Sequence, residues 1–188
     1  GMRKSLVLLT CILLLASGCS TMTTAEKVQK REQLDFMAET AIDGLIKRDP
    51  GIGQELENSL GYAVANMKLT KVPVVGAGGG EGVFVNKQTG QRTYFTVSRL
   101  DVGGGWGARS YKVLVVFESQ QVMDKMEGGV WVFQAGAEAS AGTAAAEGST
   151  GDLNKGFTMH VLSDGGASAT VTARVIRTKV NKKLSEDD

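Results

Sequence analysis

The side chains that most often carry catalysis or bind metals are few and scattered in this sequence. His160 is the only histidine, and it shares one face of a predicted strand with Thr158 and Leu162. A metal site needs several ligands, and none adjoins this histidine. Glu81 lies between glycines and Glu138 interrupts a run of small residues, so both predict solvated charge rather than a two-carboxylate mechanism. We therefore predict no enzyme activity, no metal and no cofactor.

The glycines are the next place to look for chemistry, because glycine-rich loops cradle phosphates. A P-loop needs a glycine followed by Lys and then Ser or Thr, and no glycine here has those neighbours. Gly103, Gly105 and Ala108 fit a loose G-x-G-x-x-A pattern, but that fingerprint must open a helix, and a strand is predicted next. The net charge of +1 gives no basis for nucleic-acid binding. We therefore expect neither a nucleotide nor a nucleic-acid ligand.

Cys19 is the residue with the clearest chemical fate. Arg3 and Lys4 precede an apolar run over residues 6–16, which has the proportions of a signal peptide. Eleven helical residues span roughly 16 Å, about half of a bilayer core, so the run is too short to cross a membrane. The small residues before Cys19 resemble the lipobox of bacterial lipoproteins, in which this cysteine is acylated, for example with palmitate. The alternative is an ordinary secretory signal with an incidental cysteine.

These observations predict how the N-terminus is processed and where the protein resides. Gly1, before the Met, is set aside, and residues 1–18 are predicted to be the signal peptide. Cys19 is the predicted lipid-attachment site, and residues 19–23 are the lipidated tether. The resemblance to bacterial lipoproteins, with Ser20 rather than Asp after the cysteine, implies an outer-membrane lipoprotein that faces the periplasm.

The composition and periodicity predict one globular domain. The chain has 188 residues, 42% hydrophobic and 22% charged, which is enough for one core and lies outside the disordered range. Thr23 and Glu26 form a capping-box pattern, and apolar residues then recur at three-to-four spacing over residues 24–48. This pattern predicts an amphipathic helix. Asp49-Pro50 predicts the start of a second helix, which Gly61 would close.

After Gly61 the period changes to two, which predicts strands. A short helix is expected at 119–127, and turns are expected at 88–90 and 164–166. The predicted fold class is α+β: an N-terminal helical pair followed by a glycine-rich antiparallel β-barrel or sandwich with one short inserted helix. The predicted strands are 62–67, 82–86, 92–99, 102–109, 111–118, 130–140, 157–162 and 167–180.

The domain is expected to span residues 24–184 as a single unit. Residues 142–156, rich in Ala, Gly, Ser and Thr, are expected to form a mobile loop. Residues 185–188 are expected to be an acidic, frayed tail.

Two stripes of glycine are the most informative pattern in the predicted sheet. Residues i, i+2 and i+4 share one face of a strand, so each stripe presents a face without side chains. One interpretation is close packing, in which a helix docks on the bare face or the strands bend sharply. The other is a groove that admits an acyl chain or a partner backbone. The stripes are Gly76, Gly78, Gly80 and Gly82, and then Gly103, Gly105 and Gly107.

The order of motifs from residue 40 to 180 resembles the SYLF-domain family. Residues 74–85 are similar to its glycine-rich G-G-x-x-G-E-G-V-L segment. This family includes bacterial lipoproteins and eukaryotic proteins that bind phosphoinositides and, in yeast, actin. The resemblance implies a lipid- or membrane-associated module without catalysis. The motifs that follow in the same order are Tyr94-Phe95, the strand ending at 107–110, the run 113–117, the helix through Met123 and Met126, and Trp131 leading into 136–140.

The charges decide which of the implied partners we expect. Residues 24–48 hold five basic and five acidic side chains, so this helix has no net positive charge to attract an anionic membrane. We therefore expect no phosphoinositide or actin binding. Arg109 stands where the family usually has Gln. The candidate lipid-binding residues are Lys68, Lys71, Gly76, Gly78, Gly80, Gly103, Gly105, Gly107, Arg109, Arg174 and Arg177.

The predicted function is a non-enzymatic lipid- or membrane-binding domain of a lipid-anchored bacterial envelope protein. Its expected partner is a membrane lipid, either a phospholipid or a fatty acid, and an envelope protein is a second possible partner. The alternative is a structural or protein-interaction module on the periplasmic face of the outer membrane. In that case the chain would have no lipid site beyond the Cys19 anchor.

Overall fold

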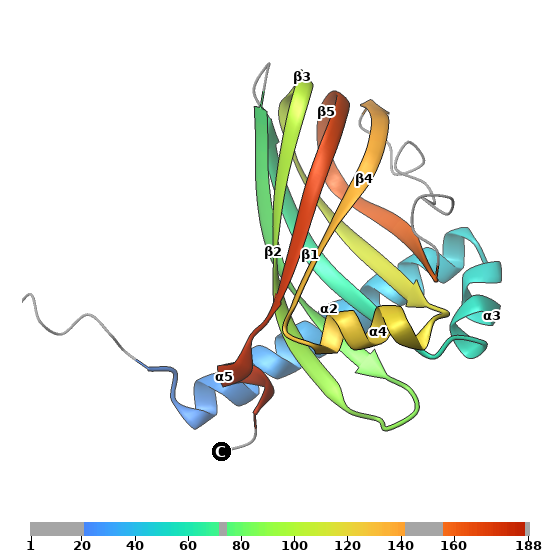
Figure 1. Ribbon diagram of the computed structural model, residues 1–188, viewed down its shortest axis with the longest axis vertical. Coiled ribbons are helices and arrows are strands. Elements are labelled where there is room, and N and C mark those ends of the chain that lie inside the picture. Colours follow the sequence, from blue (N-terminus) through green and yellow to red (C-terminus); the bar gives the residue numbers. More distant parts are fainter. Residues whose placement is uncertain (1–20, 72–74, 142–155, 187–188) are drawn as a thin grey trace, which may run out of the picture.

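The computed structural model describes residues 21–71, 75–141 and 156–186. In these residues a long helix is followed by one curled antiparallel sheet with three short helices around it (Figure 1). The architecture is mixed α+β, as the sequence predicts. The predicted signal peptide, Cys19 and most of the predicted mobile loop lie outside the described residues.

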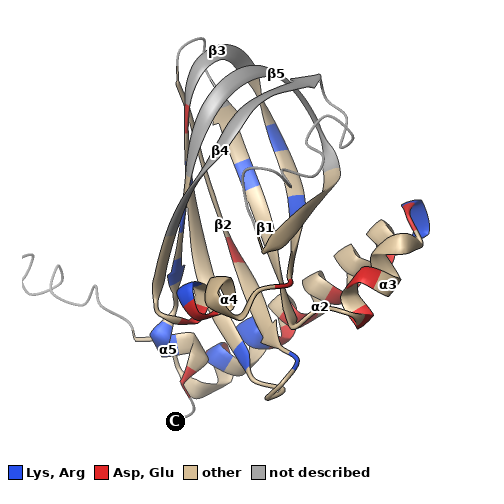
Figure 2. Cartoon of the chain, turned by 45° about the vertical axis from the view of Figure 1, so that its right-hand side comes forward, with Lys and Arg blue, Asp and Glu red and all other residues tan. Residues whose placement is uncertain are grey.

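The long helix, α2, spans Thr24–Arg48 and begins as its sequence predicts. The Thr23 hydroxyl accepts from the backbone N–H of Glu26, and the Glu26 carboxylate accepts from the backbone N–H of Thr23. These two bonds form a complete capping box. One stripe of α2 is buried against the sheet, and charges of both signs lie along the rest (Figure 2). The buried stripe is Leu34, Ala38, Ala41 and Leu45.

The second helix, α3, spans Gly51–Glu57 and is shorter than predicted at both ends. Pro50 occupies the N-cap position, and the Asp49 carboxylate before it accepts from the backbone N–H of Gly51. Gly61 does not close this helix but begins the first strand, where a Cβ would lie 2.6 Å from the carbonyl oxygen of Val85. Glycine is needed there for strand pairing rather than for a helix end.

Among the described residues the sheet contains five strands in the order β1-β2-β3-β5-β4, all antiparallel to their neighbours. The first half of β3 pairs with β2, whereas its second half pairs with β1, so the sheet curls back on itself. In the described part of the chain no pairing joins β4 to the first half of β5, and the sheet is not closed. The strands are β1 Gly61–Lys71, β2 Val75–Asn86, β3 Arg92–Phe117, β4 Val130–Ala141 and β5 Phe157–Val180.

The two longest strands differ from the sequence-based prediction. Residues 92–118 were predicted as three strands and residues 157–180 as two, but each region is one continuous strand. The predicted turn at 164–166 is instead part of β5, beside a register shift next to Ser110 and Tyr111. Glycine and a bulge let a strand coil sharply without ending. The hairpin turn predicted at Gln88-Thr89-Gly90 is confirmed, with Gly90 at φ 74°.

The sheet has two differently covered faces. The outer face packs against α2 and α3 and includes Val64, Val83, Leu114 and Val116, each fully buried. The inner face is closed at one end by α4, Gln120–Glu127, through Met123 and Met126. The aromatic residues Phe84, Phe117, Trp131 and Phe157 gather at that same end, in tilted and edge-on contacts.

The C-terminal segment is attached to the outer face as far as Glu186. Ser185, expected to begin a frayed tail, ends the short helix α5, Lys182–Ser185. Its hydroxyl accepts from the backbone N–H of Tyr94 and donates to the backbone carbonyl of the same residue. The guanidinium of Arg31 donates to the carbonyl oxygens of Leu184 and Glu186.

Candidate functional site

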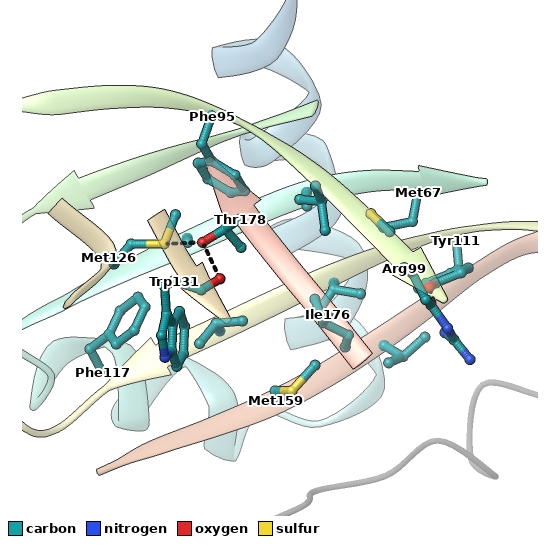
Figure 3. Close-up of a pocket in the computed structure, with 16 residues that line it drawn as sticks. Met67, Phe95, Arg99, Tyr111, Phe117, Met126, Trp131, Met159, Ile176 and Thr178 are labelled. Carbon is teal, nitrogen blue, oxygen red and sulfur yellow. Dashed lines mark hydrogen bonds between the residues drawn. The ribbon is translucent and has the colours of Figure 1, made fainter. Parts of the chain in front are cut away.

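A narrow apolar cavity lies on the inner face of the sheet (Figure 3). Its volume is about 60 Å³. The space is therefore a narrow slot rather than an open chamber. Its lining is Ala63, Ala65, Met67, Phe95, Val97, Arg99, Tyr111, Val113, Val115, Phe117, Met126, Trp131, Met159, Val161, Ile176 and Thr178.

The two ends of this slot differ in chemistry. Phe117, Trp131 and Met126 lie at one end, beside α4, and Arg99 and Tyr111 lie at the other (Figure 3). The Thr178 hydroxyl is also part of the lining, but it is engaged with the Met126 sulfur and with the carbonyl oxygen of Trp131.

The polar end is a buried cluster with tight geometry. Arg99 Nε and Nη2 donate to the two carboxylate oxygens of Asp101 at 2.8 and 2.9 Å, and Nη1 donates to the Tyr111 hydroxyl at 2.6 Å. Asp101 is fully buried and Arg99 is 4% exposed. The guanidinium carbon of Arg109 lies 4.4 Å from the centre of the Tyr111 ring, in cation–π contact.

Strand alternation explains why these side chains meet. Arg99 and Asp101 continue the inward positions of Phe95 and Val97 along β3, two residues apart. Farther along the same strand, Tyr111 and Val113 also face inward. Because β3 folds back against β1 and β2, its two halves bring Arg99 and Tyr111 together across the cavity.

The glycines of β2 do not line this cavity. Gly78, Gly80 and Gly82 lie on the same inward face of β2 as Phe84, but the backbone of β1 fills the space in front of them. A Cβ at Gly78 would lie 2.5 Å from the carbonyl oxygen of Lys68, and Cβ atoms at the other two would overlap the carbonyl oxygens of Asn66 and Val64. At these three positions the structure shows close packing, the first of the two interpretations drawn from the sequence.

The remaining candidate residues are dispersed. Lys68 and Arg177 are exposed and lie in one row across β1, β2, β3 and β5, with Gly79 and Ser98 between them. Three strand spacings separate them, roughly 14 Å. Arg109 is 6% exposed and adjoins the polar end of the cavity through Tyr111.

Six other candidates are placed in the sheet by their backbone alone. Gly76 lies in β2, and Gly107 in β3 has φ 128°. The side-chain placements of Lys71 and Arg174, and the surroundings of Gly103 and Gly105, lie outside what the structure describes, as does Cys19.

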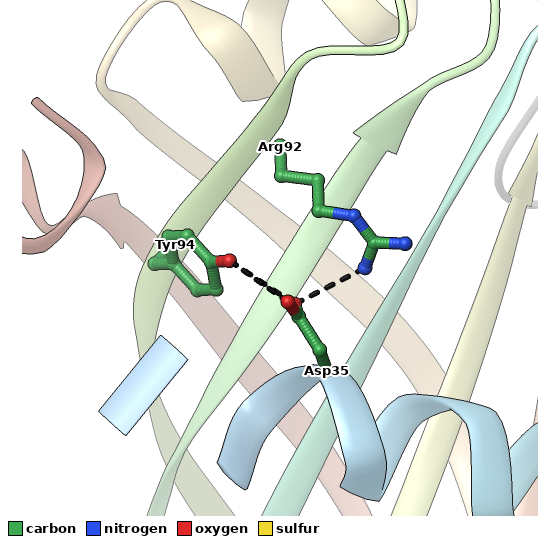
Figure 4. A network of polar contacts seen from close by, with 3 residues as sticks. All are labelled: Asp35, Arg92 and Tyr94. Atoms are coloured by element: carbon green, nitrogen blue, oxygen red, sulfur yellow. Dashed lines mark hydrogen bonds and ion pairs between the residues drawn. The ribbon is translucent and has the colours of Figure 1, made fainter. Parts of the chain in front are cut away.

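A second polar network lies on the outer face, where α2 crosses β3 (Figure 4). The Tyr94 hydroxyl donates to the Asp35 carboxylate at 3.1 Å, and Arg92 Nη1 pairs with the same carboxylate at 3.1 Å. Burial, followed by the negative charge of Asp35 and its hydrogen bond, raises the pKa of Tyr94 to about 12. This network attaches the helix to the sheet.

The only histidine also has a partner on the outer face. His160 Nε2 lies 2.9 Å from a carboxylate oxygen of Glu55 in α3, and the Thr158 hydroxyl donates to the other oxygen. Glu55 is far from His160 in the sequence, so local spacing could not reveal this contact. Among the residues described, no three His, Cys, Asp or Glu side chains converge as a metal site would require.

Sequence reasoning missed the cavity and most of the polar cluster at its end. Of this cluster it named only Arg109 as a candidate residue. The sequence did contain one signal. Alternate residues of a strand face the same side, and this alternation places Arg99, Asp101 and Arg109 on the face of the apolar positions 97 and 113. Charges in the inward series of a strand predict a buried polar cluster.

Comparison with known proteins gives a distant relative. No family model matches the chain. Over 158 residues the chain is 24% identical to a protein named Beta cell expansion factor A from Aeromonas veronii. The match covers 84% of this chain and 60% of the relative, so the chain spans about three fifths of that protein's length. No helix in the described residues has both the length and the apolar character needed to cross a bilayer.

Proposed function

We propose that the chain is a non-enzymatic, SYLF-like lipid-binding domain of a lipid-anchored bacterial envelope protein, and that the inner cavity holds an acyl chain. The observation that carries this proposal is the slot itself, lined mainly by aliphatic, Met and aromatic side chains. An apolar slot left empty loses the dispersion contacts that its lining would otherwise make. A hydrocarbon chain would restore them without demanding hydrogen bonds.

The shape of the slot favours one chain over a bulky ligand. Its volume of about 60 Å³ is small, so a ligand must be slender. The lining holds two Ala and three Met side chains, and Met adapts readily to a flexible chain. Anchoring at Cys19 would place such a domain next to its lipid source.

The test is native mass spectrometry of the full chain, purified in digitonin, whose rigid ring system is too bulky for the slot. The chain is measured as isolated and again after incubation with oleic acid. Denaturing mass spectra separate chains attached covalently at Cys19 from lipid that is held without a bond. We expect one non-covalent lipid or one oleic acid per protein.

Two matched variants locate the ligand. Ala65→Leu adds three carbons inside the slot, whereas Ala77→Leu adds the same atoms at an exposed position of β2. We expect Ala65→Leu to lose most of the bound lipid and Ala77→Leu to keep it. A wild-type chain that holds no lipid and takes up no oleic acid would overturn the proposal, as would equal occupancy in both variants. The protein-interaction alternative would then be the better hypothesis.

A further inference from the structure

The outward side of α2 carries a large apolar side chain that the fold leaves uncovered. Phe36 is 71% exposed, the most exposed of the large hydrophobic residues in the described part of the chain. The helical period turns it about half a turn away from the buried residues Leu34 and Ala38. Phe36 therefore lies largely outside the core, in the position of an aromatic residue that anchors a protein–protein contact.

The charged residues around Phe36 are acidic. Glu32, Glu39 and Asp43 are exposed and lie on the same side of the helix, within two turns of the ring. Within the described residues, none of the three has an ion-pair partner. These four residues, called here the Phe36 face, present one aromatic ring within a negatively charged surround.

A groove elsewhere on the surface has the complementary character. It lies between the turn that joins α4 to β4 and the end of β5 with α5, and its volume is about 690 Å³. It is lined by the exposed residues Lys179, Lys182 and Lys183, which have no acidic partner in the part of the chain that the structure describes. The two lysines of α5 are visible in Figure 2. Val130, which is 48% exposed, adds an apolar wall to this lysine groove.

We propose that the Phe36 face of one copy docks in the lysine groove of a second copy, with the ring of Phe36 beside Val130. The two surfaces do not meet within one molecule, because Phe36 is exposed there. Their charges are opposite in sign, and each surface offers one apolar side chain at the contact. A membrane surface would satisfy the lysine groove alone, whereas a second copy satisfies both surfaces.

The charges also decide the symmetry of the contact. Two α2 helices packed antiparallel around Phe36 would bring Glu32 of one copy close to Glu39 of the other, which repels. A contact between the face and the groove joins unlike surfaces, so each pair keeps one free face and one free groove. Such a contact can repeat from copy to copy. This inference does not depend on the acyl-chain site.

The first measurement is sedimentation velocity of the full chain in digitonin over a series of protein concentrations. We expect dimers and longer species that increase with concentration and decline in about 1 M NaCl, where the screening length is about 3 Å. Phe36→Ser should weaken the association by about tenfold or more, because the ring is no longer removed from water. The control, Val28→Ser, changes another exposed apolar residue of α2 outside the Phe36 face and should associate as the wild type does.

A mixture of two variants separates this contact from any other form of association. Phe36→Ser loses the face and keeps the groove, whereas Lys182→Glu/Lys183→Glu loses the groove and keeps the face. Each variant alone should be mainly monomeric. Mixed, they should form a one-to-one dimer and no longer species, because the pair has only one intact face and one intact groove to join. Native mass spectrometry, with one variant labelled with heavy nitrogen, identifies the composition of the dimer.

Each outcome bears on the proposal. A wild-type chain that is monomeric at every concentration would overturn it, as would a mixture without mixed dimers. Self-association of the lysine variant at the wild-type level would also overturn it, because the groove would not be the receiving surface. In that case, a preference for phosphatidylglycerol over phosphatidylcholine vesicles that only the lysine variant loses would assign the groove to a membrane surface instead.

Discussion

The two faces of the sheet use the same strands but are filled differently. Val116 faces outward and is fully buried between the sheet and its helices, whereas its neighbour Val115 faces inward and lines the cavity. On the outer face, the buried stripe of α2 packs directly against the side chains of the strands. On the inner face only the strands themselves and α4 can fill the space.

The comparison shows where the hollow comes from. β1 contributes Ala63 and Ala65 to the inner face and Val64 to the outer one. Two small side chains in the middle of a curled sheet leave room that the larger residues at its ends do not reach. The cavity is therefore a product of side-chain size on one face, and substitutions on the two faces should behave differently.

Breaking an ion pair should give the largest difference in unfolding free energy between the inner and outer faces of the sheet. Arg99→Gln would leave Asp101 charged and fully buried, which should lower the free energy of unfolding by about 3–5 kcal/mol. Lys30→Gln breaks the pair between α2 and Glu81, whose side chains are 33% and 43% exposed, and should cost about 0–1 kcal/mol. Urea denaturation at pH 7 measures both. Equal losses would mean that the inner cluster is hydrated.

The adjacent valines give the next largest difference. Val116→Ala removes two methyl groups from a filled site and should cost about 2–3 kcal/mol. Val115→Ala removes the same atoms beside existing empty space and should cost about 1 kcal/mol or less, because fewer contacts are lost. Thermal and denaturant unfolding of both variants provide the values. A larger loss at Val115 would contradict a hollow inner face.

Adding a side chain at the inner-face glycines of β2 should lower the free energy of unfolding, because the backbone of β1 occupies the space in front of them. A Cβ at Gly80 would overlap the carbonyl oxygen of Asn66, which is backbone and cannot turn aside. Gly80→Ala should therefore cost about 1–3 kcal/mol. The control, Gly53→Ala in α3, meets only Ile46 at 3.8 Å and should stabilise the chain by about 0.5–1 kcal/mol. If Gly80→Ala were neutral, the glycine stripe would have space in front of it.

Local patterns were enough to predict part of this fold. The capping box fixed the start of α2, the three-to-four spacing of Leu34, Ala38 and Ala41 marked its buried stripe, and Gly90 marked a hairpin turn. Strand ends were harder to predict, because the glycines around position 105 allow a strand to coil as readily as they allow it to stop.

The candidate site depended on contacts that sequence spacing does not contain. Arg99 meets Tyr111 because β3 folds back on itself, and Glu55 meets His160 because α3 packs beside β5. The lipid-binding role itself stays a prediction, since it came from a resemblance and from bare strand faces. On β2 those faces proved to be occupied by the neighbouring strand rather than open.

The smallest expected effect concerns the polar network of the outer face, which differs from the inner cluster by joining a helix to the sheet. Tyr94→Phe removes one hydrogen bond to the Asp35 carboxylate, which Arg92 still neutralises, and should cost about 1–2 kcal/mol at pH 8. Because the folded pKa of Tyr94 is raised to about 12, above the ordinary value of 10, the folded chain holds this proton more tightly than the unfolded chain does. That stabilisation is complete below pH 10 and is lost as the pH rises from 10 to 12. The difference in unfolding free energy between wild type and variant should therefore shrink between pH 8 and pH 11. A constant difference over that range would mean that the hydroxyl is not held by the carboxylate, and that α2 is retained by its apolar stripe alone.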